Sequence, residues 1–226
     1  MKKYLLLAMT GLMVLLLGMA LPALGAEKEL FADDFSDAEK SSAWWSARKG
    51  AGLTATGENF FSEMVEIADG KLTLKAPEAE EWASVILTGE AAISGEVRNF
   101  AVETRMAFKE VTDQRNAHIG VVLWTGFSER VIFMHRLRGF YSFGRTEPDL
   151  EVSLSMPFDF QPEVGKMVDV RLEMNATESG SEVVFFVNDE FIGARHFGIL
   201  KDATRIGLYA YKADAEFDYF RVLALD

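Results

Sequence analysis

The chain has 226 residues, no cysteine, and 35 acidic residues against 23 basic ones, which gives a formal net charge of −12 at pH 7. Without cysteine it forms no disulfide bonds, so apolar burial or bound ions must stabilise it. The negative charge disfavours nucleic acid and anionic membrane surfaces as partners, and an acidic chain with 12% aromatic residues is better suited to neutral ligands such as glycans, or to cations.

Residues 1–25 have the layout of a secretory signal peptide. A short basic start, an apolar run from Tyr4 to about Met19 and a group of small residues follow one another, with cleavage expected after Gly25 or Ala26. A single membrane anchor is the alternative interpretation of the apolar run. The small residues and the polar segment after them favour removal, so we expect a secreted or periplasmic chain that is not inserted in a membrane after cleavage.

The mature chain, residues 26–226, has the length of one domain with a large core. Its clearest alternations of apolar and polar residues lie at residues 71–75, 100–108, 117–124, 130–137, 140–145, 167–174, 182–188, 205–211 and 217–225. In the alternation at 167–174, the apolar residues from Val168 to Met174 share one face, which is typical of a half-buried antiparallel strand.

Turn residues separate these alternating runs. Asp69-Gly70, Asn188-Asp189 and the polar segment 175–181 each follow or precede an alternation. No amphipathic helix of ordinary length interrupts the series. Short strands with this punctuation predict an all-β protein, built as a two-sheet antiparallel β-sandwich of the jelly-roll type.

Several short motifs follow one another in an order shared with a known superfamily. They are LFADDFSD at 30–37, Trp44-Trp45, ADGKLTL at 68–74, the strand FAVETRMAF at 100–108 and the closing FDYFRV at 217–222. In this order the chain resembles the concanavalin A-like lectin/glucanase superfamily. Within it the chain is most similar to laminarinase- and lichenase-type glucanases, laminin G-like modules and 3-keto-disaccharide hydrolase-like domains. The resemblance covers nearly all of the mature chain and implies a concanavalin A-like fold.

The resemblance also implies where a glucanase carries its catalytic groups. These enzymes use a Glu-x-Asp-x-Glu triplet on one central strand, where alternate residues share a face. In this chain the corresponding segment at 128–137 holds one carboxylate, Glu129, at its start. The triplet spacing recurs at Glu147, Asp149 and Glu151. Pro148 within that segment is typical of a loop between hairpin strands, so we assign no catalytic residue.

The strands at 117–124 and 130–137 carry apolar residues on both faces. This is unusual for a sheet with one side in water, and it predicts an outer face that loops or a ligand partly cover. Aromatic rings stack on the C–H faces of sugars, and planar polar groups hydrogen-bond to hydroxyls. The candidate ligand-binding residues are His118, Trp124, Arg136, Arg138, Tyr141 and Arg145. The alternative is an indole within the core and solvated arginines.

The resemblance further implies a structural calcium site. In the glucanases a Ca²⁺ ion on the convex side ties the first strand to the last, through two backbone carbonyls and an aspartate of the closing strand. The matching positions are the carbonyl of Asp34, the glycine Gly70 and the side chain of Asp218. Oxygen donors of this mixed kind suit Ca²⁺. In the alternative, Asp218 caps a strand end or pairs with a neighbouring base such as Arg221.

Two functions from different classes follow from these observations. The first is an exported, non-catalytic carbohydrate-binding module whose partner is a glycan or oligosaccharide, and the missing triplet favours it. The second is a glycoside hydrolase of the 3-keto-disaccharide hydrolase-like kind, which the length without an attached catalytic domain favours. A structural part of an envelope assembly is a third. No feature of the sequence predicts an oligomeric state.

Overall fold

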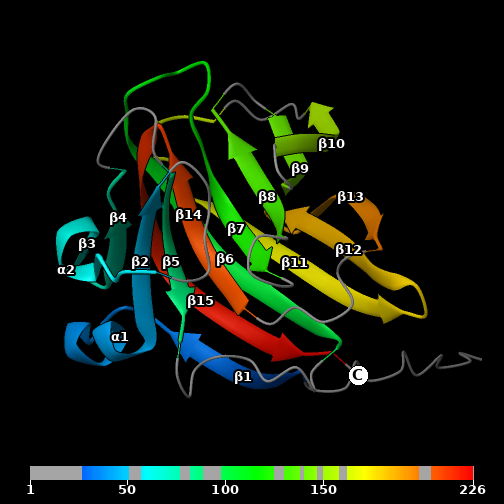
Figure 1. The fold of residues 1–226 in the computed structure, drawn as a ribbon, viewed down its shortest axis with the longest axis horizontal. Coiled ribbons are helices and arrows are strands. Elements are labelled where there is room, and N and C mark those ends of the chain that lie inside the picture. Colours follow the sequence, from blue (N-terminus) through cyan, green and yellow to red (C-terminus); the bar gives the residue numbers. More distant parts are fainter. Residues whose placement is uncertain are drawn as a thin grey trace, which may run out of the picture.

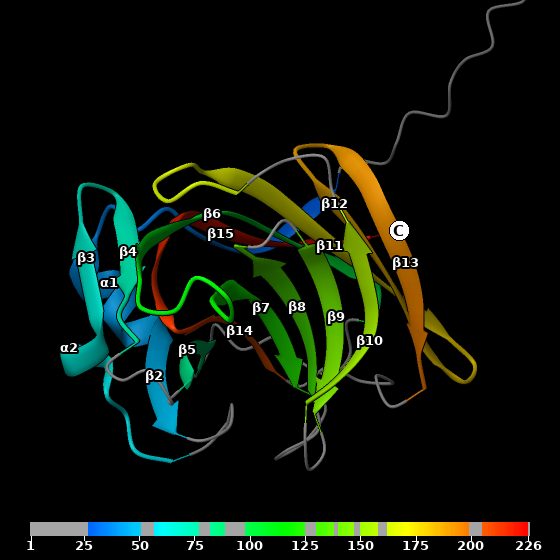
Figure 2. The same cartoon turned by 90° about the horizontal axis from the view of Figure 1, so that it is seen from above.

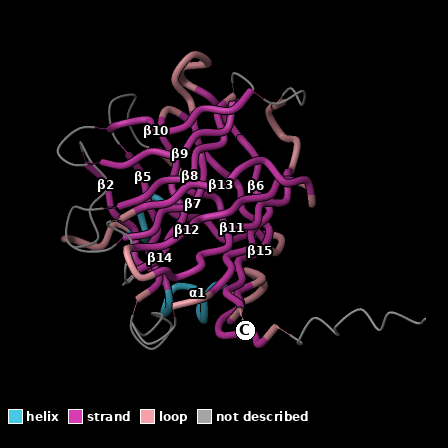
Figure 3. The backbone as a smooth tube through the Cα atoms, turned by 90° about the vertical axis from the view of Figure 1, so that its right-hand side faces the viewer, coloured by secondary structure: helices cyan, strands magenta, loops and turns pink. Residues whose placement is uncertain are grey.

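The computed structural model describes residues 27–50, 57–76, 82–88, 98–124, 130–137, 140–146, 150–157, 162–198 and 205–225. The expected signal peptide lies outside the described residues. Strands make up most of the described chain, and helix is confined to short segments (Figure 3). None of the helices in these ranges is long and apolar enough to cross a membrane.

Eight described strands form one antiparallel sheet. They are β1 (Lys28–Asp33), β3 (Val65–Ala68), β4 (Lys71–Leu74), β6 (Phe100–Val111), β11 (Val168–Thr177), β12 (Gly180–Val187), β13 (Glu190–Phe197) and β15 (Ala213–Ala224). Their order is β13-β12-β11-β6-β15-β4-β3, and β1 pairs with β15 beside this path. The last strand therefore contacts both the first strand and the middle of the sheet.

Seven further strands form the second antiparallel sheet. They are β2 (Trp45–Gly50), β5 (Trp82–Leu87), β7 (His118–Trp124), β8 (Arg130–Arg136), β9 (Phe140–Thr146), β10 (Leu150–Pro157) and β14 (Arg205–Tyr211). Their order is β10-β9-β8-β7-β14-β5-β2. The two sheets curve over each other as two layers (Figures 1 and 2), which confirms the predicted β-sandwich.

The hydrophobic core lies between the two layers. β11 alternates between buried and partly exposed residues from Val168 to Met174, as the sequence predicts. From the other sheet, Phe133 packs on Phe185 with the ring centroids 4.6 Å apart. The predicted hairpin around Pro148 is also present, because β9 and β10 pair in antiparallel register on either side of it.

A short helix, α1 (Ala38–Trp44), carries the chain from the first sheet to the second. It begins after Asp37, whose side chain accepts a hydrogen bond from the backbone N–H of Lys40 at 3.0 Å, which satisfies one of the free donors at a helix start. It ends where Trp45 becomes extended and starts β2. The second helix, α2 (Phe61–Met64), is a single turn before β3.

A buried carboxyl group holds the corner between β1, α1 and β2. Asp33, which is 6% exposed, accepts hydrogen bonds from the N–H of Phe35 at 2.9 Å, the hydroxyl of Ser41 at 3.0 Å and the indole N–H of Trp45 at 2.9 Å. The Trp45 ring in turn packs edge-on against Phe220 of β15, with the centroids 5.1 Å apart. One side chain therefore fixes the first strand, the helix and the second strand relative to one another.

Candidate functional site

Four strands of the seven-stranded sheet, β5, β7, β8 and β14, are largely buried on both of their sides. Every residue of β7 is buried, and β8 is buried from Arg130 to His135. On the side away from the sandwich core, which we call the outer face, a second apolar cluster forms with Trp82 packed against it. Its members are Ile86, Val122, Trp124, Ile132, Met134 and Tyr209.

Two glycines make room for the largest rings of this outer face. The hydroxyl of Tyr209 donates a hydrogen bond to the carbonyl of Phe133 at 3.2 Å. A Cβ atom at Gly120 would overlap that carbonyl oxygen and lie 3.1 Å from the Tyr209 ring. At Gly207 a Cβ would lie 2.9 Å from the ring of Trp124. Only a residue without a side chain lets these rings lie flat across the neighbouring strands.

Four rings gather at one end of the outer face, and we call them the aromatic cluster: Trp82, His118, Tyr209 and Tyr211. Tyr211 pairs in register with both Trp82 and His118. The rings of Trp82 and Tyr211 are stacked, with centroids 4.6 Å apart and planes at 25°, and the His118 ring lies 4.9 Å from Trp82. Trp82 and Tyr211 are partly exposed, whereas His118 and Tyr209 are buried. The cluster therefore presents two rings to a ligand and supports them with two others.

Buried polar atoms accompany these rings. Burial, and after it the charge of Arg136, lowers the pKa of His118 from 6.5 to about 3, so the imidazole is neutral at neutral pH. Its Nδ1 atom and the hydroxyl of Ser84 are both buried without a hydrogen-bond partner. Since an unpaired buried polar group costs about 1–3 kcal/mol, both atoms would gain from a ligand hydroxyl.

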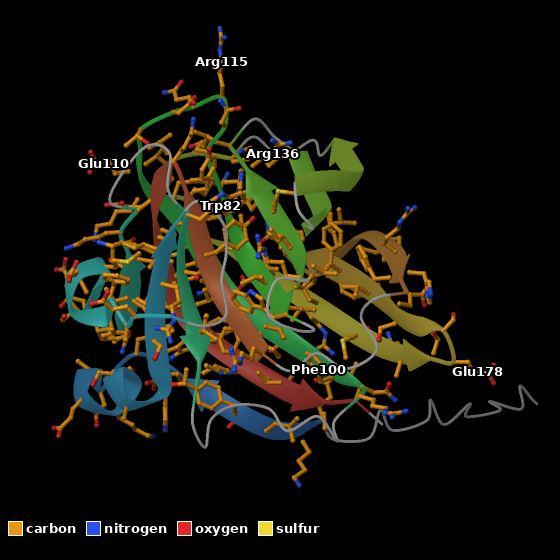
Figure 4. All side chains as sticks on the ribbon, viewed as in Figure 1. Trp82, Phe100, Glu110, Arg115, Arg136 and Glu178 are labelled. Atoms are coloured by element: carbon orange, nitrogen blue, oxygen red, sulfur yellow. The ribbon has the colours of Figure 1, made fainter. Side chains whose placement is uncertain are left out.

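The charged side chains of the outer face are arginines. Strand pairing places Arg48 beside Ser84, Arg136 beside His118, and Arg130 and Arg205 on either side of Trp124. Burial lowers the pKa of Arg130 to about 10, and burial together with the charge of Arg205 lowers the pKa of Arg48. No aspartate or glutamate lies among the described strand residues that share this face. Figure 4 shows Arg136 and Trp82 toward the same end of the sheet.

The structure separates the six residues predicted to bind ligand. His118, Trp124 and Arg136 lie together on the outer face, and Trp124 is fully buried there. Arg138 lies outside the described residues. The backbone of β9 pairs Tyr141 with His135 and Arg145 with Val131.

The register of β9 therefore matches Tyr141 and Arg145 with the core side of the sheet. Val131 belongs to the core between the sheets, and His135 packs on Phe108 of that core, with ring centroids 5.2 Å apart. The side chains of β9 lie outside the described part of the structure. Of the carboxylates with triplet spacing, Glu147 and Asp149 also lie outside the described residues. The backbone of Glu151 lies opposite that of Arg145 in the β9–β10 ladder.

Sequence reasoning missed three members of the aromatic cluster, Trp82, Tyr209 and Tyr211. A signal for the two tyrosines was present, because in RIGLYAY they alternate with Ile206, Leu208 and Ala210, which line the core. No such signal marked Trp82. The strand WASVIL that it opens is buried on both faces and shows no alternation.

Of the three positions predicted to bind calcium, Asp34 and Gly70 lie side by side, and Asp218 lies on the strand that pairs with the strands next to both of them. A Cβ atom at Gly70 would lie 3.9 Å from the carbonyl oxygen of Asp34. β15 pairs with β4 up to Phe217 and with β1 from Phe220 onward, and its register shifts at Asp218. The aspartate thus lies where the last strand passes from one partner to the other. Two backbone carbonyls and one carboxylate are oxygen donors of the kind that Ca²⁺ takes.

Asp218 also has a basic neighbour. Its Oδ2 atom lies 3.5 Å from Nη1 of Arg105, and its side chain is 36% exposed. The predicted alternative partner, Arg221, instead stacks over the ring of Tyr219 at 5.1 Å. The described residues contain no group of three or more histidine, cysteine, aspartate or glutamate side chains that could hold a metal ion. Any site here depends on the backbone carbonyls.

No protein-family model and no curated protein sequence matches the chain. Among solved structures it is similar to an endo-1,3-β-glucanase from Streptomyces sioyaensis, with TM-score 0.59 and 11% identity over 89% of this chain and 98% of the other. It is similar to the carbohydrate-binding module CBM66 from Bacillus subtilis, with TM-score 0.53 and 13% identity over 77% and 93%.

A lectin domain gives a third likeness. The carbohydrate recognition domain of Emp46p, solved in a potassium-bound form, matches with TM-score 0.55 and 15% identity over 83% of this chain and 91% of that domain. At these identities the likeness concerns the fold alone. The chain has the concanavalin A-like jelly-roll fold found in carbohydrate-binding modules, lectin domains and glucanases.

Proposed function

We propose that the protein is an exported, non-catalytic carbohydrate-binding module that holds a glycan against the aromatic cluster. The observation that carries the proposal is the pair of partly exposed, stacked rings of Trp82 and Tyr211, with Arg136 in the same row of the sheet. Sugar C–H faces pack on such rings, and the nearby arginine and imidazole supply hydrogen bonds to hydroxyls. The carbohydrate-binding and glycan-acting proteins of the same fold support this class of ligand.

The chemistry of the face supports binding over hydrolysis. Glycoside hydrolysis uses two carboxyl groups that flank the bond to be cleaved. The described strand residues of the outer face supply arginines, one neutral histidine and tyrosines, but no carboxylate. Product analysis on any glycan that binds tests this point, and release of shorter sugars would support the hydrolase alternative.

Replacing Trp82 by alanine weakens glycan binding about tenfold or more, because stacking on an indole and the burial it provides are worth about 1–2 kcal/mol. A glycan array on the mature protein identifies the ligand, and isothermal titration calorimetry on the best hit measures the loss. Phe191 of β13 is 62% exposed on the other sheet and gives the matched aromatic control. Phe191→Ala keeps full affinity. Equal affinities of the Trp82 variant and the parent protein would move the binding site elsewhere.

For the metal, we propose a structural Ca²⁺ ion held by the carbonyls of Asp34 and Gly70 and the carboxylate of Asp218. An ion bound only by the folded chain stabilises it by about 2.7 kcal/mol at a concentration of 100 times Kd. For a chain of this length that corresponds to a rise in Tm of roughly 5–10 °C. Melting curves in excess CaCl₂ and in EDTA measure the difference.

Asp218→Asn removes this calcium-dependent rise and leaves the Tm in EDTA nearly unchanged. The matched control is Asp189→Asn, in the turn between β12 and β13, where asparagine tolerates the positive φ of 65°. That variant keeps the full rise. Coincident curves for the parent protein in CaCl₂ and EDTA would show that no calcium ion binds at Asp218.

We further propose that the mature chain starts near Glu27, outside the cytoplasm. The n-region, the apolar run and the small residues before Ala26 support this start. The carboxylate of Glu27 accepts hydrogen bonds from both terminal nitrogens of Arg171, at 2.6 and 3.2 Å. A mature chain that starts at Glu27 therefore keeps this contact. N-terminal sequencing of protein from the exported fraction gives Ala26 or Glu27. An intact Met1 would show that the segment is retained.

A further inference from the structure

The outer surfaces of the two sheets differ in how their charges are matched. On the eight-stranded sheet several basic residues pair with acidic ones, among them Lys71, Arg105 and Arg171. Arg171 there forms ion pairs of 2.6–2.8 Å with Glu27, Glu103 and Glu173. On the outer face of the seven-stranded sheet the charged residues of the described strands are arginines alone. A chain with a net charge of −12 thus keeps one face free of strand carboxylates.

Arg48 and Arg136 lie on either side of the aromatic cluster, and neither forms an ion pair with a described carboxylate. Arg48 donates one hydrogen bond from Nη1 to the carbonyl of Ala47 at 2.9 Å, and its Nε atom is buried without a partner. Burial raises the pKa of Tyr209 and lowers that of His118, and the charge of Arg136 is close enough to act on both groups, opposing the rise and adding to the fall. Each guanidinium therefore has donor capacity directed at the same face.

A partly buried guanidinium without a counter-charge is costly, and a neutral sugar hydroxyl compensates only part of that cost. A carboxylate compensates it better, because the planar fork of arginine binds both carboxylate oxygens at once. Among the described strand residues of this face every charged side chain is an arginine rather than a lysine, which is the choice that favours planar anions. The ligand that completes the face is thus one that carries anionic groups.

We propose that the glycan bound on the outer face is an acidic polysaccharide whose sugar units carry carboxylate groups, with sulfate as the related chemistry. The inference rests on the proposed function and names its ligand class. Arg48 and Arg136 stand four strand spacings apart, from β2 to β8, which is about 19 Å at ~4.8 Å per spacing. The two arginines bind anionic groups of different units, so the ligand is a chain rather than a single sugar.

The overall charge of the protein does not predict this ligand, since a net negative chain repels polyanions in general. This repulsion makes the test specific, because acidic glycans gain nothing from non-specific attraction. Isothermal titration calorimetry compares oligogalacturonate with the same oligomer after methyl esterification, which keeps the backbone and removes the charge. We expect the acid to bind at least tenfold more tightly than the ester. Added NaCl should weaken the binding of the acid and leave that of the ester unchanged. Dextran sulfate against dextran gives the same comparison for sulfate.

Arg48→Gln and Arg136→Gln each weaken binding of the charged ligand about tenfold, because each removes one charge-assisted pair, and Arg48→Gln leaves binding of the methyl ester unchanged. Arg195→Gln, on the exposed edge strand β13, is the charge-matched control and changes neither affinity. Equal binding of acid and ester overturns the inference while the proposed function stands. Binding of no glycan of either kind, charged or neutral, overturns the proposed function itself. Binding of dextran sulfate without oligogalacturonate identifies sulfate as the recognised group.

Discussion

Asp33→Ala lowers the free energy of unfolding by about 3–5 kcal/mol, because it removes the acceptor for three hydrogen bonds and leaves the buried hydroxyl of Ser41 and indole N–H of Trp45 unpaired. Each buried donor left without a partner costs about 1–3 kcal/mol. The loss corresponds to a fall in Tm of roughly 10 °C for a domain of this size. Urea unfolding followed by tryptophan fluorescence measures it.

The neighbouring aspartate provides the control for this change. Asp34 accepts hydrogen bonds from the N–H and the hydroxyl of Ser36 at an exposed position. Asp34→Ala therefore changes the free energy of unfolding little, since water accepts hydrogen bonds from both donors in place of the carboxylate. The loss in free energy of unfolding for Asp33→Asn lies between those of the two alanine variants, because the amide oxygen still accepts hydrogen bonds while the amide nitrogen cannot. Equal unfolding curves for the two alanine variants would show that the buried corner does not depend on this carboxyl group.

Acidification from pH 7.5 to 5 lowers the free energy of unfolding by about 4 kcal/mol through two buried histidines, at about 2 kcal/mol each. Burial lowers the pKa of both His118 and His135 from 6.5 to about 3. The unfolded chain then binds protons that the folded chain excludes. Their contribution is complete above pH 6.5 and is lost progressively as the pH falls from 6.5 toward 3.

Urea titrations at several pH values in this window measure the slope, and most carboxylates stay ionised there. His118→Gln halves the slope whatever it does to the stability at pH 7.5, because one of the two titrating groups is gone. Equal stability at pH 7.5 and 5 would mean that the imidazoles are solvated in the folded state.

The sequence predicts the fold well because several strands alternate clearly between two kinds of residue. β11 shows its core face from Val168 to Met174 without any knowledge of its neighbours. β5, opening at Trp82, is apolar on both faces and has no such alternation, which is why it escaped detection. Local pattern thus identifies the sandwich but not every strand in it.

The site was harder to predict because it depends on register between distant strands. Whether a residue of β9 faces the core or the outer face is fixed by its pairing with β8, and this pairing matches Tyr141 with His135. In the same way, Asp33 and Asp34 are neighbours in the sequence. Only the pairing of Asp33 with Phe220 decides which of the two is buried. Such pairings span much of the chain, so no local motif reveals them.

The position of β15 governs when the protein can fold. This strand, the last of the chain, lies between β6 and β4 and also pairs with β1. The centre of the eight-stranded sheet is therefore complete only when β15 is in place, and loop closure across the whole domain must precede the main gain in burial.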